Sequence, residues 1–218
     1  KEEAQPVFFE NLLDGKTFQR VRNQIIFKAD GRYYITVIDN NKFRYNIHHF
    51  NQLPEGAPYQ LVNGKLLIMP SPKKHHQLTL GNLHLEIGAY VKKNKLGNIL
   101  IAPMDVHFDD DNIYQPDLMF ISNQREGIMR DFVFGAPDLV VEIASFGTRK
   151  VDETEKKEVY AKNGVLEYWI IDPIKKEIEI FINEKNTLIL KESYASSGII
   201  HSKTVDGFSF ELEDLFQD

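Results

Sequence analysis

The sequence predicts an α/β protein of the mixed α+β kind, with a mixed central sheet flanked by helices and an N-terminal β-hairpin extension. Two extended segments are apolar on both faces, which is typical of central strands covered on two sides. A long segment with apolar residues at helical spacing precedes them, and a shorter helical segment follows. These observations predict a core in the order α-β-β-β-α-β.

The composition is that of an ordinary folded domain without a membrane span. Of 218 residues, 42% are hydrophobic and 27% charged, and no apolar run approaches the roughly twenty residues of a spanning helix. The chain has no cysteine, which excludes a disulfide framework and a thiolate zinc site and fits a reducing compartment such as the cytoplasm. A net charge of −6 argues against nucleic-acid binding by bulk electrostatics. Binding would need a local patch, for which the candidate clusters are Lys73-Lys74-His75-His76, Lys92-Lys93-Asn94-Lys95 and Arg149-Lys150.

Residues 1–44 are predicted to form an appended β-arm. Asp30-Gly31 lies between two β-rich runs, Ile25-Ile26-Phe27 and Tyr33-Tyr34-Ile35, and Asp-Gly in such a context is a strong hairpin signal. Residues 45–218 are expected to form one domain, because their length suits a single core.

That domain opens with a strand and a long helix. A candidate strand over residues 59–68 precedes Pro70-Ser71-Pro72, and a helix of roughly five turns follows, with a stop at Gly97. His75 and His76 are expected at a solvated helix start, with contact to phosphate as the alternative.

The rest of the domain is predicted from its apolar runs and turn residues. A short helix over about residues 151–163 is expected to end at Gly164. Extended segments are predicted at residues 99–108, 114–122, 138–145, 167–171, 178–182, 188–191 and 208–212.

Asp117 and Glu142 each stand inside an apolar strand. A buried carboxylate is costly unless it is paired or bound to a cation, so the alternatives are a metal site, a salt bridge, or a strand end in water. Asp138 shares a strand face with Glu142 but lies roughly 13 Å away, too far to clasp the same ion. It is therefore assigned to the strand start. Asp117 can be brought opposite Glu142, and two carboxylates with backbone carbonyl and water suit Mg²⁺ or Mn²⁺.

The second helix adds a lysine to these acids. Asp152, Lys156 and Tyr160 are spaced at i, i+4 and i+8 and therefore share one face, whereas Lys157 points about 100° away. Lys156 is thus the lysine directed at the sheet, or else its stem lies along the core with the ammonium in water. Asp152 and Glu155 resemble an N-terminal capping pair.

The order of these motifs resembles the PD-(D/E)XK nuclease superfamily, and within it the Uma-two group of restriction-type endonucleases, over roughly residues 45–216. The resemblance implies a restriction-endonuclease-like core. The matching stretches are Tyr59-Gln60-Leu61-Val62-Asn63-Gly64-Lys65-Leu66, Gln115-Pro116-Asp117-Leu118, Ala136-Pro137-Asp138-Leu139-Val140-Val141-Glu142-Ile143-Ala144-Ser145, residues 152–160 and Glu167-Tyr168-Trp169-Ile170-Ile171-Asp172-Pro173.

The resemblance implies metal ligands at Asp117, Glu142 and the backbone carbonyl of Ile143, with Gln60 as a further candidate. Lys156 stands where the group carries its lysine on the helix; the superfamily pattern would place that lysine at the position of Ala144. The chain departs from the group at Gln60, where a Glu is usual, and at Lys65, where an acid is common.

The function implied is a metal-dependent endonuclease that hydrolyses phosphodiester bonds, with DNA as the expected substrate, Mg²⁺ or Mn²⁺ as the cofactor and a homodimer as the candidate assembly. Asp117, Glu142 and Lys156 would be the catalytic residues. Gln60, Lys65 and the acidic charge motivate a first alternative, a nuclease fold without catalysis that serves as a binding or assembly module. A second alternative is a small β-rich interaction protein in which both acids form only salt bridges.

Overall fold

The computed structural model describes residues 43–53, 56–69, 71–145 and 149–217, together with the backbone of four short strands that precede them. Those four strands form one sheet, in the spatial order β1 (Val7–Phe8), β4 (Arg32–Val37), β3 (Gln24–Ala29) and β2 (Phe18–Val21). β3 and β4 pair antiparallel up to Ala29 and Arg32, as the predicted hairpin requires. Its turn, Asp30-Gly31, lies outside the described residues.

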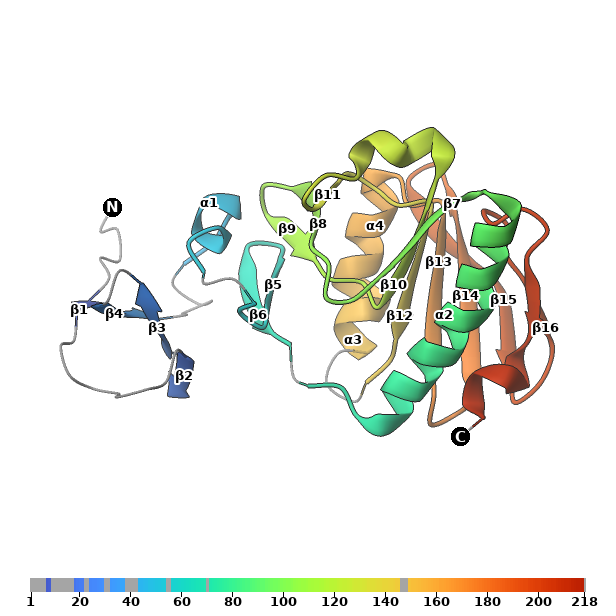
Figure 1. Ribbon diagram of the computed structural model, residues 1–218. Coiled ribbons are helices and arrows are strands. Elements are labelled where there is room, and N and C mark those ends of the chain that lie inside the picture. Colours follow the sequence, from blue (N-terminus) through green and yellow to red (C-terminus); the bar gives the residue numbers. More distant parts are fainter. Residues whose placement is uncertain are drawn as a thin grey trace.

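The centre of the domain is a six-stranded mixed sheet (Figure 1). In spatial order its strands are β15 (Thr187–Ala195), β14 (Glu177–Glu184), β13 (Glu167–Asp172), β12 (Leu139–Ile143), β10 (Leu118–Ser122) and β7 (Gly97–Ile101). β12 and β13 run parallel, and all other neighbours are antiparallel. The mixed central sheet is therefore confirmed.

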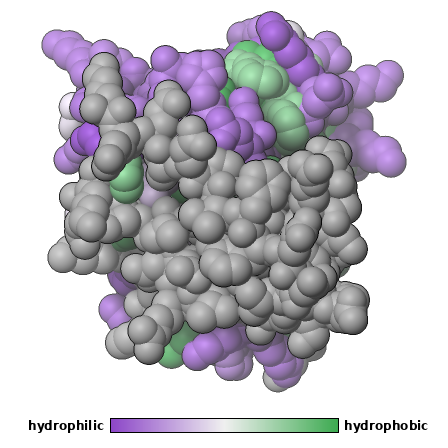
Figure 2. Space-filling model, turned by 90° about the vertical axis from the view of Figure 1, so that its left-hand side faces the viewer, coloured by the Kyte–Doolittle hydropathy of each residue, from purple (hydrophilic) through white to green (hydrophobic). Residues whose placement is uncertain are grey.

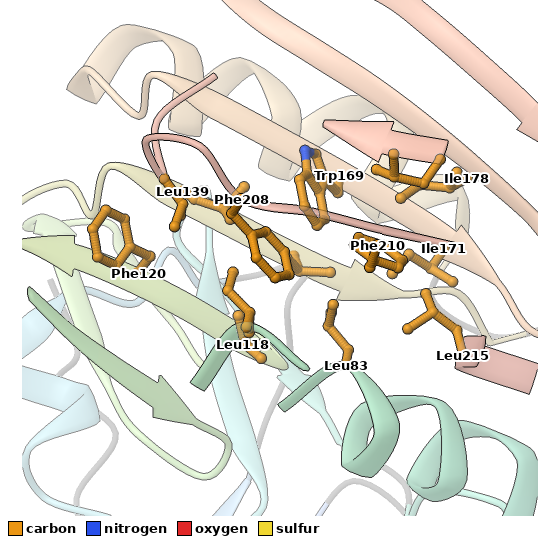
Figure 3. Packing of buried hydrophobic residues seen from close by; sticks show 14 of the residues in the cluster. Leu83, Leu118, Phe120, Leu139, Trp169, Ile171, Ile178, Phe208, Phe210 and Leu215 are labelled. Carbon is orange, nitrogen blue, oxygen red and sulfur yellow. The ribbon is translucent and has the colours of Figure 1, made fainter. Parts of the chain in front are cut away.

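Helices cover both faces of this sheet, as the apolar strands predicted. On one face, Leu139 and Val141 of β12 pack with Leu83 of α2 (Lys74–Asn94), and Figure 3 shows this side of the core. On the other face, Val140 and Ala144 pack with the segment that contains α4 (Lys157–Asn163). Successive side chains of a strand point to opposite faces, so Glu142 belongs to the face of Val140 and Ala144.

The long helix α2 is confirmed, but it ends differently from the prediction. Lys95, with a left-handed φ of 56°, caps the helix, and its N–H donates to the carbonyl of Lys92. Gly97 is already the first residue of β7, where an added Cβ would lie 2.2 Å from the carbonyl oxygen of Ile121. The glycine is required by this close approach of two strands and not by the helix stop.

A second, five-stranded sheet divides two segments that the sequence predicted as single strands. Its order is β11 (Val133–Phe134), β8 (Val106–Asp109), β9 (Asn112–Tyr114), β5 (Tyr59–Val62) and β6 (Lys65–Ile68). The segment 99–108 contributes to β7 and β8, and the segment 114–122 contributes to β9 and β10, in different sheets. Pro103 and Pro116 lie between the paired parts, where a missing N–H interrupts the ladder.

The predicted strand 59–68 is a hairpin, so that prediction was wrong. β5 and β6 pair antiparallel, and the two turn residues Asn63 and Gly64 both have positive φ, 47° and 72°. Asn-Gly favours this kind of turn because both residues tolerate left-handed backbone. The Asn63-Gly64 pair is the sequence signal for this turn, and it lies within a run of mostly apolar residues.

The second helix is confirmed, with an irregular start. It comprises α3 (Arg149–Val151), a π-helical turn η2 (Asp152–Lys156) and α4, and it ends at Gly164, whose φ is 91°. The predicted capping pair is wrong. Asp152 lies inside the helix and is buried against Lys156, while Glu155 accepts a hydrogen bond from Asn63.

The remaining described elements are short: α1 (Ile47–Phe50), η1 (Asn123–Ile128), β16 (Ile199–His201), β17 (Ser209–Glu211) and η3 (Leu212–Phe216). β16, β17 and η3 close the core on the side of α2, where Phe210 and Leu215 are buried (Figure 3). On the face shown in Figure 2, the described residues are mostly hydrophilic, with a small hydrophobic patch near the upper edge. None of the described helices is long and apolar enough to cross a membrane.

Candidate functional site

Two neighbouring strands bring Asp117 and Glu142 together. Leu118 pairs with Val141 in the antiparallel β10–β12 ladder, and one further step in this register sets Asp117 opposite Glu142. The Ile143 N–H donates to Asp117 Oδ2 at 2.7 Å. This hydrogen bond links the end of β12 to the residue that precedes β10. Asp117 and Glu142, which are 25 positions apart in the sequence, therefore become neighbours.

Glu142 is buried and receives two hydrogen bonds on the same oxygen. Lys156 Nζ donates to Glu142 Oε1 at 2.9 Å, and the Tyr160 hydroxyl donates to it at 2.5 Å. Burial raises the pKa of Glu142 to about 8; Asp152 and Asp117 add to the rise, and Lys156 opposes it. A bound cation would therefore compete with protons for this carboxyl group.

Lys156 is the lysine that points at the sheet. Its ammonium lies 3.0 Å from Asp152 Oδ1 as well as beside Glu142, and its side chain is 5% exposed. Burial alone would lower the pKa of Lys156, yet the carboxylates of Glu142 and Asp152 raise it above its ordinary value. Burial is thus the main cause of the raised pKa of Glu142, whereas the neighbouring carboxylates cause the raised pKa of Lys156.

Lys157 lies elsewhere, as the helical phase predicted. Its ammonium is 3.8 Å from the centre of the Phe181 ring, and partial burial lowers the pKa of Lys157. The alternative for Lys156, an amphipathic stem with its ammonium in water, is wrong, because the whole side chain is buried.

His76 completes the contacts of Asp117. Its Nε2 lies 3.2 Å from Asp117 Oδ1, and each of the two side chains is 14% exposed. The sequence favoured a solvated helix start for both histidines, which holds for the exposed His75 and is wrong for His76. The overlooked signal is spacing, since His76 continues the buried helical stripe of Leu80, Leu83 and Ile87 at intervals of three and four residues.

Asp138 has a structural environment, as its assignment to the strand start implied. Its Oδ2 accepts the Ser122 N–H at 2.7 Å, and its Oδ1 pairs with Arg125 Nε at 3.2 Å. The same guanidinium donates to the carbonyls of Ala136, Pro137 and Gly164. The salt bridge to a lysine or arginine, raised as the alternative for Asp117 and Glu142, is present at Glu142 with Lys156, and Asp138 has a similar pair with Arg125.

The positions at which the chain departs from the family pattern differ in burial. Gln60, in β5, is buried and donates from Nε2 to the carbonyl of Gln115 at 3.4 Å, two residues before Asp117. Lys65 is exposed at the start of β6. Ala144, buried just after β12, donates its N–H to the carbonyl of Ile171. Of these three positions, Gln60 is the one that is buried and also contacts the segment just before Asp117.

The chemistry of these side chains fits Mg²⁺ or Mn²⁺. Glu142 and Asp152 flank the Lys156 ammonium, Asp117 lies one step further along the ladder opposite Glu142, and hard divalent cations prefer such oxygen ligands. No three His, Asp or Glu side chains within the described part of residues 43–217 are grouped to hold an ion. Mg²⁺ commonly uses one or two carboxylates and keeps several waters. The residues present therefore suit a cation held by two carboxylates and water.

Comparisons with known proteins place this arrangement in a family. The family model Uma2, described as "Putative restriction endonuclease", matches residues 47–213. The structure is similar to the crystal structure of "a putative nuclease belonging to DUF820" from Anabaena variabilis ATCC 29413, with a TM-score of 0.65 and 19% identity, over 78% of this chain and 97% of that one. At this identity the likeness supports the fold alone. A search of curated proteins found no match.

The fold and the family model agree with the resemblance that the sequence motifs indicated. The α-β-β-β-α-β core is formed by α2, β7, β10, β12, the α3–α4 helix and β13, and the matched residues extend over all of it. Because the family model covers well over half of the chain, this protein belongs to the Uma2 family of restriction-endonuclease-like proteins in the PD-(D/E)XK superfamily.

Proposed function

We propose that this protein is a divalent-metal-dependent endonuclease that hydrolyses phosphodiester bonds in DNA, with Asp117, Glu142 and Lys156 as its catalytic residues. The observation that carries the proposal is the placement of Lys156, whose ammonium donates to Glu142 although the two residues lie 14 positions apart on a helix and a strand. A buried lysine beside paired carboxylates is costly to maintain, which favours a functional role. Family membership supports the same reaction class.

In this proposal the two carboxylates hold the cation. Asp117 and Glu142 would bind Mg²⁺ or Mn²⁺ together with the Ile143 backbone carbonyl, and Gln60 is a further candidate ligand. When bound, such a cation lowers the pKa of a coordinated water and stabilises the charge that develops on a phosphate. Lys156 would orient the attacking water or neutralise the phosphate, and Asp152 keeps the ammonium in place.

A small basic surface beside the site suits an anionic substrate. Lys73, Lys74 and His75 are exposed at the start of α2, next to His76, which contacts Asp117. Of the other two clusters, Lys92 and Lys93 lie in the last turn of α2, and Arg149 is paired with Glu153 and Asp172. The first cluster therefore offers phosphate contacts where the reaction would occur, in a protein whose net charge is −6.

A second candidate function is a nuclease fold that binds or assembles without cleaving. It is favoured by the neutral Gln60, which replaces an acid usual in the group, and by the two donors that engage Glu142. A site with two carboxylates holds Mg²⁺ more weakly than one with three. Metal binding without cleavage would distinguish this function from the enzymatic one.

The deciding experiment incubates supercoiled plasmid DNA with the full chain and millimolar Mn²⁺ or Mg²⁺, and records thermal melting under the same conditions. Asp117→Asn and Glu142→Gln serve as site variants. We expect the parent alone to cut the plasmid and to melt at a higher temperature with metal, because ligand binding stabilises the folded state. A metal-induced rise without cleavage would support the binding module. An equal rise in all three proteins would contradict the proposed site.

Two finer parts of the proposal concern assembly and location. A homodimer would allow both strands of a duplex to be cut by two copies of the site, in keeping with the prevalence of twofold symmetric assemblies. Light scattering on the full chain, with and without DNA, tests this assembly. The cytoplasmic location rests on the cysteine-free composition and stays a prediction.

A further inference from the structure

We propose that His76 is a positioning residue of this site, which holds the Asp117 carboxylate in the orientation that binds the cation. The inference rests on the proposed function. It adds a residue of the first described turn of α2 to a site otherwise built from Asp117, Glu142 and Lys156.

Two groups contact the Asp117 carboxylate, one at each oxygen. The Ile143 N–H reaches Oδ2 at 2.7 Å from β12, and His76 Nε2 lies 3.2 Å from Oδ1 on the helix side. Contacts at both oxygens restrict the rotation of the carboxylate plane. A carboxylate oxygen has more than one acceptor position, so each remains able to bind a cation.

The core fixes where His76 points. Leu80, Leu83 and Ile87 are buried on the face of α2 that packs against the sheet, and His76 continues this stripe by one turn. Asp117 comes to the same place because its carbonyl accepts the Ala102 N–H beside β7 and its carboxylate is held by Ile143. The contact between His76 and Asp117 therefore lies between a helix and a sheet that are both held by core packing or hydrogen bonds.

His76 carries a cost that a merely structural residue would avoid. Its Nδ1 is buried and, in the described part of the chain, has no hydrogen-bond partner. An unpaired buried polar atom opposes folding, and an apolar side chain would pack the helix without that penalty. The contact of the other ring nitrogen, Nε2, with Asp117 gives a reason for a histidine at this position despite the cost.

Residues that hydrogen-bond to metal ligands commonly change metal affinity by about 10- to 100-fold when they are replaced. The decisive comparison is between two amides. In His76→Gln the side-chain Nε2 occupies nearly the position of the imidazole Nε2 and can still donate to Asp117, whereas His76→Asn is too short to reach that position. His201, exposed in β16, supplies the matched controls His201→Gln and His201→Asn.

Isothermal titration with Mn²⁺ should give a Kd about 10- to 100-fold weaker for His76→Asn. We expect His76→Gln to stay within about threefold of the parent, as both His201 variants should, because each keeps the donor at Asp117. Circular dichroism confirms folding of each variant. Equal weakening in the two His76 variants would contradict the positioning role and would point to the imidazole itself as a ligand. An unchanged Kd in His76→Asn would also overturn the inference.

A metal-free measurement separates this inference from the proposed function. In ¹⁵N-histidine NMR spectra of the apo protein, the Nε2 signal of His76 should move in Asp117→Asn and stay in Asp138→Asn, because only the first variant alters its partner. If the parent binds no Mn²⁺ while this signal behaves as expected, the proposed function fails and the contact stands. If the signal does not respond to Asp117→Asn, the positioning role of His76 is wrong.

Discussion

The ammonium of Lys156 lies 2.9 Å from Glu142 Oε1, and it reaches this carboxylate from a helix and not from the strand that carries Glu142. The position two residues after Glu142, where the superfamily pattern places a lysine, holds the buried Ala144. A π-helical turn, η2, precedes α4 and ends at Lys156. The lysine of the site therefore comes from a separate helix. The packing of that helix against the sheet sets the distance between the ammonium and Glu142.

The first prediction compares Lys156→Met with Lys157→Met. Loss of Lys156 should abolish plasmid cleavage and lower the free energy of unfolding by about 3–5 kcal/mol, because the buried carboxylates of Glu142 and Asp152 lose the ammonium that pairs with both. Lys157→Met removes a contact with Phe181 and should leave cleavage within about twofold of the parent, because that contact lies outside the site. Urea unfolding and a plasmid assay measure both. Similar activity in the two variants would show that neither lysine is catalytic.

The second prediction concerns the hydroxyl of Tyr160. Tyr160→Phe removes one of the two donors to Glu142 Oε1 and should cost about 1–3 kcal/mol of stability and weaken Mn²⁺ binding. Tyr168→Phe is the matched control, because its hydroxyl donates to the carbonyl of Asp152 and leaves Glu142 untouched. The control should lose stability with little change in metal affinity. Titration calorimetry in which both variants bind Mn²⁺ like the parent would count against a role for Tyr160 at the site.

The third prediction concerns Gln60, the buried departure from the family pattern. Gln60→Glu should raise Mn²⁺ affinity by on the order of tenfold, or about 1.4 kcal/mol, because a third carboxylate adds charge for a hard cation. Without metal the variant should melt at a lower temperature, since a carboxylate replaces the amide that donates to the Gln115 carbonyl. Unchanged affinity would place Gln60 outside the metal's ligands.

The fourth prediction separates the two Pro-Asp pairs. Asp138→Asn should lower the free energy of unfolding by about 1–3 kcal/mol, because the pairing with Arg125 and the strong hydrogen bond from Ser122 are weakened. Mn²⁺ affinity should stay within about twofold of the parent, since Asp138 lies roughly 13 Å from Glu142 along the strand. A large loss of metal binding in Asp138→Asn, with stability preserved, would reverse the roles assigned to these acids.

The fifth prediction is a pH dependence of stability that originates at His107. Burial lowers the pKa of His107 below 6.5, its ordinary value, and both ring nitrogens lack partners within the described residues. Between the folded-state pKa and 6.5 the unfolded chain binds more protons, so stability falls as pH drops below 6.5, by at most about 1.4 kcal/mol per pH unit. His107→Leu should flatten this part of the profile. Urea titrations at several pH values that give parallel curves for both proteins would rule His107 out.

Much of the fold could be predicted from local patterns. The apolar faces of β10 and β12 indicated central strands, and the spacing of leucines indicated α2, because burial on one or two sides is written into the period of apolar residues. The same reasoning separated Lys156 from Lys157 by helical phase. The pairing of Asp117 with Glu142 followed once two adjacent strands were assumed.

Other features depended on long-range contacts that periodicity does not contain. The segment 99–108 divides between two sheets at Pro103. The local sequence does not indicate which strands will pair with the residues on either side of this proline. Hydrogen-bond partners likewise cannot be predicted from one segment alone. Arg125 pairs with Asp138, and Tyr160 donates to Glu142, in each case between different elements.

The order of the core helices and strands, the two acids beside apolar strands and the lysine that faces Glu142 could all be predicted, because each follows from the spacing of residues within one element. The contacts of His76 with Asp117 and of Arg125 with Asp138 depend on how the elements pack together. In the sequence, Asp117 and Asp138 each follow a proline and look alike. They differ physically in the side chain that contacts each carboxylate in the folded protein, a histidine for Asp117 and an arginine for Asp138.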